Sequence, residues 1–303
     1  MPQSQRDVRN RIGSVANIQK ITRAMEMVAA ARLRRAEQRI AALRPYANAI
    51  ARMTRETVEA AGASVLTMPL LREHDSERKV AMLLVSSDRG LAGAFNSQVL
   101  RAAVRSGVEH EEQGQAVVWY ASGRRGVSSL TFRGHEPRGA YVGFTDRPSY
   151  ADARQIADDL MSAYLDDQID RVEIMYNGFV SPLVQEVRRE VLLPLSAAAV
   201  LGGEGSEEQP DDEAATRRAA VEYEPEPEQL LGRLVPDFVE ISIFRALLES
   251  TASEHGARMT AMRNASDNAG ELITDLTLEM NRARQAEITQ EILEVVAGAE
   301  GLG

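Results

Sequence analysis

Hydrophobic residues near the N-terminus recur at steps of three and four, which is the spacing of one face of a helix. The pattern continues over residues 3–44, and the other positions are rich in Arg, Gln and Asn. We predict a helix of roughly 60 Å over this range. Pro45 should kink or end it, and residues 46–61 resume the helical pattern. The stripe consists of Val8, Ile12, Val15, Ile18, Ile21, Met25, Val28, Leu33, Ala36, Ile40 and Leu43.

The C-terminal part of the chain carries a second stripe of the same period. No proline follows Pro236, and residues 237–297 would form one helix of roughly 90 Å. Such a length is typical of coiled coils or bundles. Neither helix can bury its stripe alone, and one runs towards the middle of the chain while the other runs away from it. We therefore predict a long antiparallel two-helix coiled coil formed by the N- and C-terminal helices.

Strand and helix patterns alternate in the middle of the chain. Buried-type strands are predicted at 79–86, 115–121 and 171–176, with helices from about Phe95 and over 149–165. Residues 184–193 and 219–223 are further strand candidates. This alternation indicates a parallel or mixed sheet covered by helices, so we expect a central Rossmann-like α/β domain.

These patterns divide the chain into three parts. We expect an N-terminal coiled-coil helix at 1–61, an α/β domain at 75–225 and a C-terminal coiled-coil helix at 227–303. Residues 202–218 (GGEGSEEQPDDEAATRR) are rich in Gly and acidic residues and have no apolar period. We interpret them as a disordered acidic insertion inside the α/β domain.

The charge of the chain is divided unevenly. Residues 1–55 hold twelve Arg or Lys against three Asp or Glu, a net charge of +9, whereas the whole chain carries −10. A basic arm on an acidic protein indicates a negatively charged partner for that arm. The alternative is a solvated basic helix face.

Composition excludes several classes of site. The chain has no cysteine, which removes disulfides, thiolate nucleophiles and zinc–thiolate sites. Its four histidines lie far apart in the sequence, which argues against a histidine metal site. The longest apolar run, Val80 to Val85, cannot span a membrane, and the N-terminus lacks the apolar region of a signal peptide. We expect an intracellular, soluble chain without a metal or cofactor.

The segment from Ser86 to Asn96 (SSDRGLAGAFN) follows a predicted strand and opens a helix. That is the setting of a phosphate-binding turn, but its glycines are spaced GxxG and no lysine follows. We interpret it as a structural turn, with nucleotide binding as the alternative. The adjacent pairs Asp158/Asp159 and Asp166/Asp167 do not face each other on a helix. The sequence therefore predicts no catalytic site.

Two helical segments have the composition of protein interfaces. Residues 25–35 (MEMVAAARLRR) combine small residues and Met with flanking arginines, although plain coiled-coil packing would explain them too. Residues 281–291 (NRARQAEITQE) are polar on most faces. A helix that is polar all round either bridges solvent or is enclosed by partners.

Several of these stretches together resemble the gamma subunit of F-type ATP synthases of the bacterial type, and the likeness covers nearly the whole chain. The matching stretches are Ile18–Glu37 with Arg44–Ala47, Ser86–Asn96, Tyr223–Leu231, Ser253–Ile273 and Asn281–Ala299. Many relatives have Cys-Gly-Gly where this chain has Ala92, Gly93 and Ala94, so no thiol-based role applies there.

The resemblance implies a non-catalytic central-stalk rotor subunit, which couples proton flow through the membrane c-ring to rotary ATP synthesis or hydrolysis at the alpha/beta catalytic sites. In that family the paired helices enter the cavity of the alpha/beta hexamer, and the α/β domain meets the epsilon subunit and the c-ring. The location implied is peripheral, on the cytoplasmic face of the bacterial plasma membrane, with membrane contact only through the complex.

The same resemblance implies which residues form the subunit interfaces. The candidates for contact with the hexamer are Met25, Arg284, Gln285, Thr289 and Glu291, and those for contact with the ring are Tyr223 and Glu226. We further expect Arg32, Arg34 and Arg35 to guide the orientation of the shaft.

Two alternative functions would require other sequence features. A dinucleotide-dependent enzyme would need a proper glycine fingerprint and a catalytic group. A nucleic-acid-binding scaffold would use the basic arm, but that arm has no aromatic residues interleaved for base stacking, and the chain is acidic overall. We therefore expect no nucleic acid among the partners.

Overall fold

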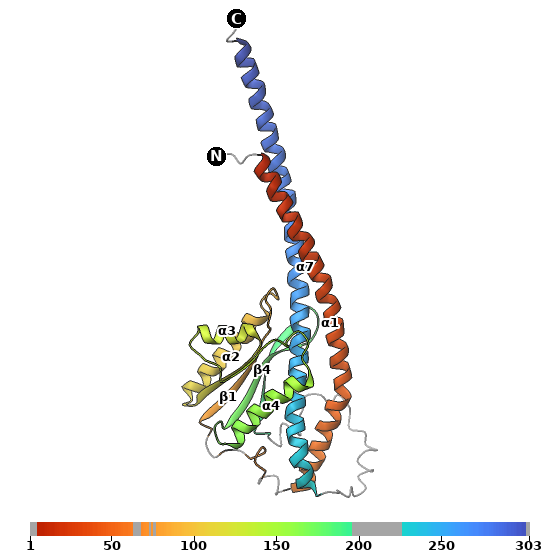
Figure 1. Ribbon diagram of the computed structural model, residues 1–303, viewed down its shortest axis with the longest axis vertical. Coiled ribbons are helices and arrows are strands. Elements are labelled where there is room, and N and C mark those ends of the chain that lie inside the picture. Colours follow the sequence, from red (N-terminus) through yellow and green to blue (C-terminus); the bar gives the residue numbers. More distant parts are fainter. Residues whose placement is uncertain (1–4, 63–67, 73, 75–76, 196–225, 301–303) are drawn as a thin grey trace. The chain divides into compact units, whose positions relative to one another are not determined.

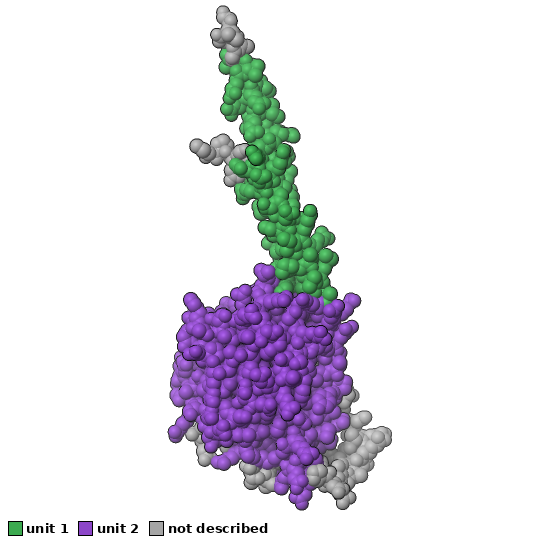
Figure 2. Space-filling model, in the orientation of Figure 1, with its two compact units in different colours: residues 1–31, 258–303 green, residues 32–257 purple. Residues whose placement is uncertain are grey.

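The computed structural model describes residues 5–62, 68–72, 74, 77–195 and 226–300. The chain forms two compact units, one of residues 1–31 and 258–303 and the other of residues 32–257 (Figure 2). The predicted strand at 219–223 and the acidic insertion at 202–218 lie outside the described residues.

Two long helices, α1 (Gln5–Ala61) and α7 (Pro227–Glu300), each contribute residues to both units (Figure 1). Pro45 lies inside α1 and does not end it. A proline in a helix interior costs about 3 kcal/mol. Packing against α7 on the C-terminal side of Pro45, where Ile50 is buried with Leu234 and Ile241, offsets this cost.

The two helices are antiparallel in both units. In the first unit the Gln19 amide donates to the Ser266 carbonyl, and Arg263 donates to Glu26 at 2.8 Å, so rising numbers in α1 meet falling numbers in α7. In the second unit Val58 of α1 shares a buried cluster with Leu231 of α7. The predicted antiparallel pairing of the terminal helices is confirmed.

The buried stripe of α1 differs from the one that the sequence indicated. Ile18, Ile21 and Val28 were assigned to it, yet each is more than half exposed. Thr22 and Ala29 are buried instead. Small side chains let two helices approach closely, so a stripe of small residues can pair where larger ones would hold the helices apart. Ile18, Ile21 and Val28 thereby face outward, whereas Val8, Leu33 and Ala36 of the predicted stripe are buried.

The α/β domain contains one five-stranded sheet with the order β3-β2-β1-β4-β5. Strands β1 to β4 are parallel where they pair, and β5 is antiparallel to β4. The strands are β1 (Lys79–Val85), β2 (Ala116–Ser122), β3 (Gly139–Tyr141), β4 (Arg171–Phe179) and β5 (Gln185–Leu193). The predicted central α/β domain is confirmed.

Helices cover both faces of this sheet. The alternation along β1 places Met82 and Leu84 against α2 (Phe95–Glu112) and α3 (Arg124–Phe132). Leu83 points to the other face, where α4 (Tyr150–Leu165) packs. Val239, Ile243 and Leu247 of α7 belong to that same core, so α7 is itself a layer of the α/β domain.

Two short elements had not been predicted. Helix α3 has nine residues and contains a glycine, and β3 has three residues. Both are shorter than the window that a hydrophobic period needs to be recognised. The tertiary context holds them, since β3 pairs only with β2 at the edge of the sheet.

A capping box begins helix α4. The Ser149 hydroxyl accepts from the Asp152 amide, and the Asp152 carboxylate accepts from the Ser149 amide at 2.7 Å. Each interaction satisfies a backbone or side-chain group that would otherwise have no partner at the end of the helix.

Replacing the capping serine should weaken the domain. We expect Ser149→Ala to lower the free energy of unfolding by about 1 kcal/mol, the usual cost of losing an N-cap. Urea unfolding followed by circular dichroism would measure it. Ser128→Ala, at an exposed position of α3, is the matched control and should change little. Equal effects of the two variants would contradict the assignment.

A buried charge cluster lies on the α2 face of the sheet. Glu173 of β4 is almost fully buried and accepts from Arg171 at 2.9 Å and from Arg189 at 2.7 Å, while the His110 ring lies 3.2 Å away. Burial alone raises the pKa of the Glu173 carboxyl, but the hydrogen bonds from Arg189 and His110 outweigh it. The pKa therefore lies below its ordinary value of 4.5.

The lowered pKa predicts how stability depends on pH. Ionised Glu173 stabilises the fold above the ordinary carboxyl pKa, and this contribution is lost as the pH falls through the depressed pKa. Glu173→Gln should therefore cost about 3 kcal/mol near neutral pH, because its partners lose a shared charged acceptor. The cost should shrink below pH 4.5. Urea unfolding at several pH values would measure it.

The matched control is Glu109→Gln, whose half-exposed carboxylate lies 3.5 Å from Arg189. Its effect should be small at every pH. A cost of Glu173→Gln that stays constant between neutral and acidic pH would contradict the prediction.

Candidate subunit interfaces

The turn after β1 occupies the place where open α/β sheets usually bind ligands. The strand order reverses between β1 and β4, and such sheets bind ligands at the carboxyl ends of the strands beside the reversal. Here the first amides of α3 already have partners. The Arg124 amide donates to Asp88, the Arg125 amide to the Ser87 carbonyl and the Gly126 amide to the Ser86 hydroxyl. These amides face protein acceptors.

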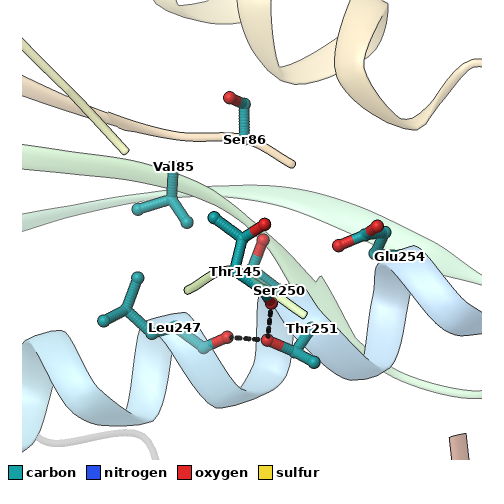
Figure 3. Close-up of a pocket in the computed structure, with 7 residues that line it drawn as sticks. All are labelled: Val85, Ser86, Thr145, Leu247, Ser250, Thr251 and Glu254. Atoms are coloured by element: carbon teal, nitrogen blue, oxygen red, sulfur yellow. Dashed lines mark hydrogen bonds between the residues drawn. The ribbon is translucent and has the colours of Figure 1, made fainter. Parts of the chain in front are cut away.

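Helix α7 covers the same end of the sheet. A pocket of about 10 Å³ remains between Val85 and Thr145 on one side and Leu247 and Thr251 on the other (Figure 3). The single proton of the Thr251 hydroxyl is shared between the carbonyls of Thr145 and Leu247, which lie 2.9 and 2.8 Å away. The volume suits about one water molecule, whereas small-molecule sites hold at least about 300 Å³. This pocket cannot hold a nucleotide.

Metal sites and membrane-spanning helices were the other features to look for in the part of the chain that the structure describes. There, no three His, Asp or Glu side chains lie close enough together to hold a metal ion. Within those residues, no helix is long and apolar enough to cross a membrane.

The predicted interface residues of α1 lie in different environments. Met25 is half-buried, and Arg34 and Arg35 are exposed. The guanidinium of Arg32 donates to both carboxylate oxygens of Asp146, in the connection between β3 and α4. Arg32 therefore has a partner within the chain.

The predicted interface residues near the C-terminus lie on an exposed stretch of helix. Every residue from Arg284 to Ala297 in α7 is exposed, which includes Gln285, Thr289 and Glu291. The Thr289 hydroxyl donates to the Gln285 carbonyl one turn earlier, and the other predicted side chains in this stretch point to solvent. The stretch is thus available to a partner on all sides.

Of the two candidates for contact with the ring, the structure describes only Glu226. Glu226 is exposed and immediately precedes α7. Tyr223 lies outside the described residues.

Large apolar side chains are exposed on both long helices, and only Met27, Val28 and Ile288 among them lie in the segments that the sequence indicated as interfaces. Contiguous exposed apolar side chains are typical of interaction sites. The signal was available in the sequence, because apolar residues near the C-terminus fall on several faces of the helix and one partner helix could not bury them all. They are Ile18, Ile21, Met27 and Val28 on α1, and Ile288, Ile292, Leu293, Val295 and Val296 on α7.

The sequence matches one protein family along nearly its whole length. A family model described as ATP synthase matches residues 4–302. The ATP synthase gamma chain of Rubrobacter xylanophilus is 44% identical over 299 residues, which cover 99% of this chain and 98% of the relative. That of Streptomyces coelicolor is 43% identical over 298 residues, covering 97% and 94%.

Solved structures share the fold. A chain of the Tetrahymena thermophila mitochondrial ATP synthase, in a structure of the central stalk and c-ring, has a TM-score of 0.61 and 24% identity, covering 81% of this chain and 99% of that one. A chain of the Euglena gracilis enzyme, in a structure of OSCP, F1 and the c-ring, has a TM-score of 0.63 and 18% identity, covering 98% and 94%.

At these identities the solved structures establish the fold alone, whereas the family model and the curated relatives cover the sequence almost from end to end. The antiparallel terminal helices and the central α/β domain agree with that assignment. The chain belongs to the ATP synthase gamma chain family.

Proposed function

We propose that this chain is the central-stalk rotor subunit of an F-type ATP synthase. It couples proton flow through the membrane c-ring to rotary synthesis or hydrolysis of ATP at the catalytic sites of the alpha and beta subunits. Support comes from the gamma chain relatives, which match over the full length, and from the fold that the chain shares with central-stalk structures.

The observation that carries this proposal is the exposed end of α7. Residues 284–297 are exposed all round and include apolar side chains such as Ile292 and Leu293. A helix with apolar residues on several faces is stable in water only when partners surround it. The alpha/beta hexamer would enclose it in a central cavity, with Arg284, Gln285, Thr289 and Glu291 as contacts.

An asymmetric helix pair can act on identical surrounding sites in different ways. Around the shared axis, α1 presents Met25 and its arginines while α7 presents other residues, so each orientation offers each surrounding subunit a different surface. A ligand or partner shifts a conformational equilibrium only through such differential contacts. Rotation would thereby favour a different conformation at each catalytic site in turn.

The remaining contacts belong to the lower end of the rotor. We propose that Tyr223 and Glu226 meet the c-ring and that the α/β domain meets epsilon and the ring. The chain then lies peripherally on the cytoplasmic face of the bacterial plasma membrane. It performs no chemistry itself. The filled switch point of the sheet supports this, because Thr251 of α7 occupies the place of a ligand.

Isolation from native membranes tests the proposal directly. An affinity tag on this chain should recover alpha, beta and epsilon subunits in a fixed ratio, together with the c-ring. The same tag on an unrelated protein of similar charge is the control. Recovery of the chain without alpha and beta subunits would overturn the proposal.

The arginines of α1 give a second test. Arg32→Ala, Arg34→Ala and Arg35→Ala together should lower the proton pumping obtained per ATP hydrolysed by up to about ten-fold, because exposed ion pairs contribute only about 0.5 kcal/mol each. Assembly should persist. Pumping by inverted vesicles and ATP hydrolysis, measured on the same preparation, give the ratio.

Two further variants separate loss of the Arg32–Asp146 pair from loss of exposed positive charge. The double variant Arg34→Ala and Arg35→Ala leaves the pair between Arg32 and Asp146 intact. Arg101→Ala, Arg105→Ala and Arg133→Ala remove the same charge from exposed positions of the α/β domain and should leave coupling unchanged. Complete loss of assembly in the α1 variant would refute an orienting role.

A further inference from the structure

Residues 142–148, between β3 and α4, make polar contacts with three other parts of the second unit. We call them the brace loop. They connect the SSD sequence after β1 with α1 and with the segment of α7 around His255. Neither the SSD sequence (residues 86–88) nor the SEH sequence of α7 (residues 253–255) has a role in the function described so far.

The brace loop is fixed to the sheet by one carboxylate. Asp88 accepts from the amides of Gly143 and Thr145 at 2.9 and 3.2 Å and from the Thr145 hydroxyl at 3.0 Å. The Asp88 amide in turn donates to the Thr145 hydroxyl at 2.9 Å. Hydrogen bonds to an ionised acceptor are short and directional, so Thr145 has little freedom relative to β1.

The same loop holds α7 through two contacts. The Thr145 carbonyl accepts from the Thr251 hydroxyl at 2.9 Å. The His255 ring lies 3.8 Å from the Asp146 carboxylate and is almost fully buried. Thr251 and His255 therefore place α7 against the brace loop.

It holds α1 through two more contacts. Arg32 donates to both oxygens of Asp146, a bidentate geometry that fixes orientation as well as distance. Seven residues along the helix, the Arg39 guanidinium donates to the Pro148 carbonyl. Asp146 thus supplies one of the two contacts to each helix, from a single side chain.

Apolar packing alone would not fix the domain against twisting. Val239, Ile243 and Leu247 hold α7 on the sheet by burial, which is non-directional. Burial opposes separation more strongly than small rotations of one surface over the other. The directional contacts between α7 and the sheet outside the loop include ion pairs with β5, in which Arg245 donates to Glu190 and Arg188 donates to Glu249. The brace loop adds directional contacts at the carboxyl end of the sheet, and these resist such rotations.

We propose that Asp146 is a positioning residue of the rotor, which locks the α/β domain to α1 and α7 so that the domain turns with the helices under load. This inference rests on the proposed rotor function. It assigns the SSD turn and the SEH segment of α7 to torque transmission, with Asp88 and His255 at the two ends of the brace.

Thermal twisting of the α/β domain provides the test. The chain contains no cysteine, so Ser128→Cys on exposed α3 gives one attachment site for a bead in this chain. With the cognate alpha/beta complex fixed to a surface, the angular variance of the bead during a catalytic pause reports torsional stiffness. Asp146→Ala should raise this variance by less than about two-fold, since the loop loses its ion pair with Arg32 and its contact with His255, while the ion pairs Arg245–Glu190 and Arg188–Glu249 between α7 and β5 remain.

Other variants keep the test decisive. Asp146→Glu retains the carboxylate and should restore much of the stiffness, which a merely structural loss would not predict. If Asp146→Ala does not assemble, Thr251→Val decides instead, because it removes the hydroxyl contact with Thr145 together with the local one with Leu247, and it keeps the shape of the side chain. Asp158→Ala, on the exposed side of α4, is the matched control and should leave the variance unchanged.

The outcomes separate the two claims. Failure of the native chain to assemble with the alpha and beta subunits or to rotate would overturn the proposed function. Rotation of the native chain with an unchanged variance in both Asp146→Ala and Thr251→Val would overturn the brace alone.

Discussion

Burial of α7 from two sides is the constraint on which the rest of the second unit depends. Between Leu231 and Leu248, Val239 and Ile243 enter the core of the sheet, whereas Leu234 and Ile241 pack with Ile50 of α1. A helix enclosed in this way cannot leave one surface without exposing the other. Helix α7 therefore belongs both to the core of the α/β domain and to a separate cluster with α1, so the stability of each contributes to that of the other.

This placement of α7 explains why the described part of the domain has the topology of a ligand-binding fold but holds only a small pocket at the usual place. Helix α7 places Leu247 and Thr251 over the carboxyl ends of the strands, where only a pocket of about 10 Å³ remains. Asp88 accepts from the backbone amides of Arg124 and Gly143. A sheet that elsewhere supports chemistry thus serves here as a rigid attachment for two helices.

Sequence patterns predicted the two helices, their antiparallel pairing, and four of the strands, because each has a long or strongly apolar pattern. They did not predict β3 or α3, whose short lengths carry no period, and they placed Ile18, Ile21 and Val28 in the wrong environment. An apolar position in a long helix can face a partner chain as well as its own, and one sequence does not separate the two. Likewise, the contact of Arg32 with Asp146 joins residues 114 positions apart, which no local pattern encodes.

The central claim is that this chain forms the shaft of a rotary complex, with the exposed end of α7 enclosed by other subunits. Electron cryomicroscopy of the complex purified from native membranes would test it most directly. We expect density for residues 284–297 inside a ring of alternating alpha and beta subunits, in contact with their inner surfaces. A complex in which this segment lies in solvent, outside any such ring, would contradict it.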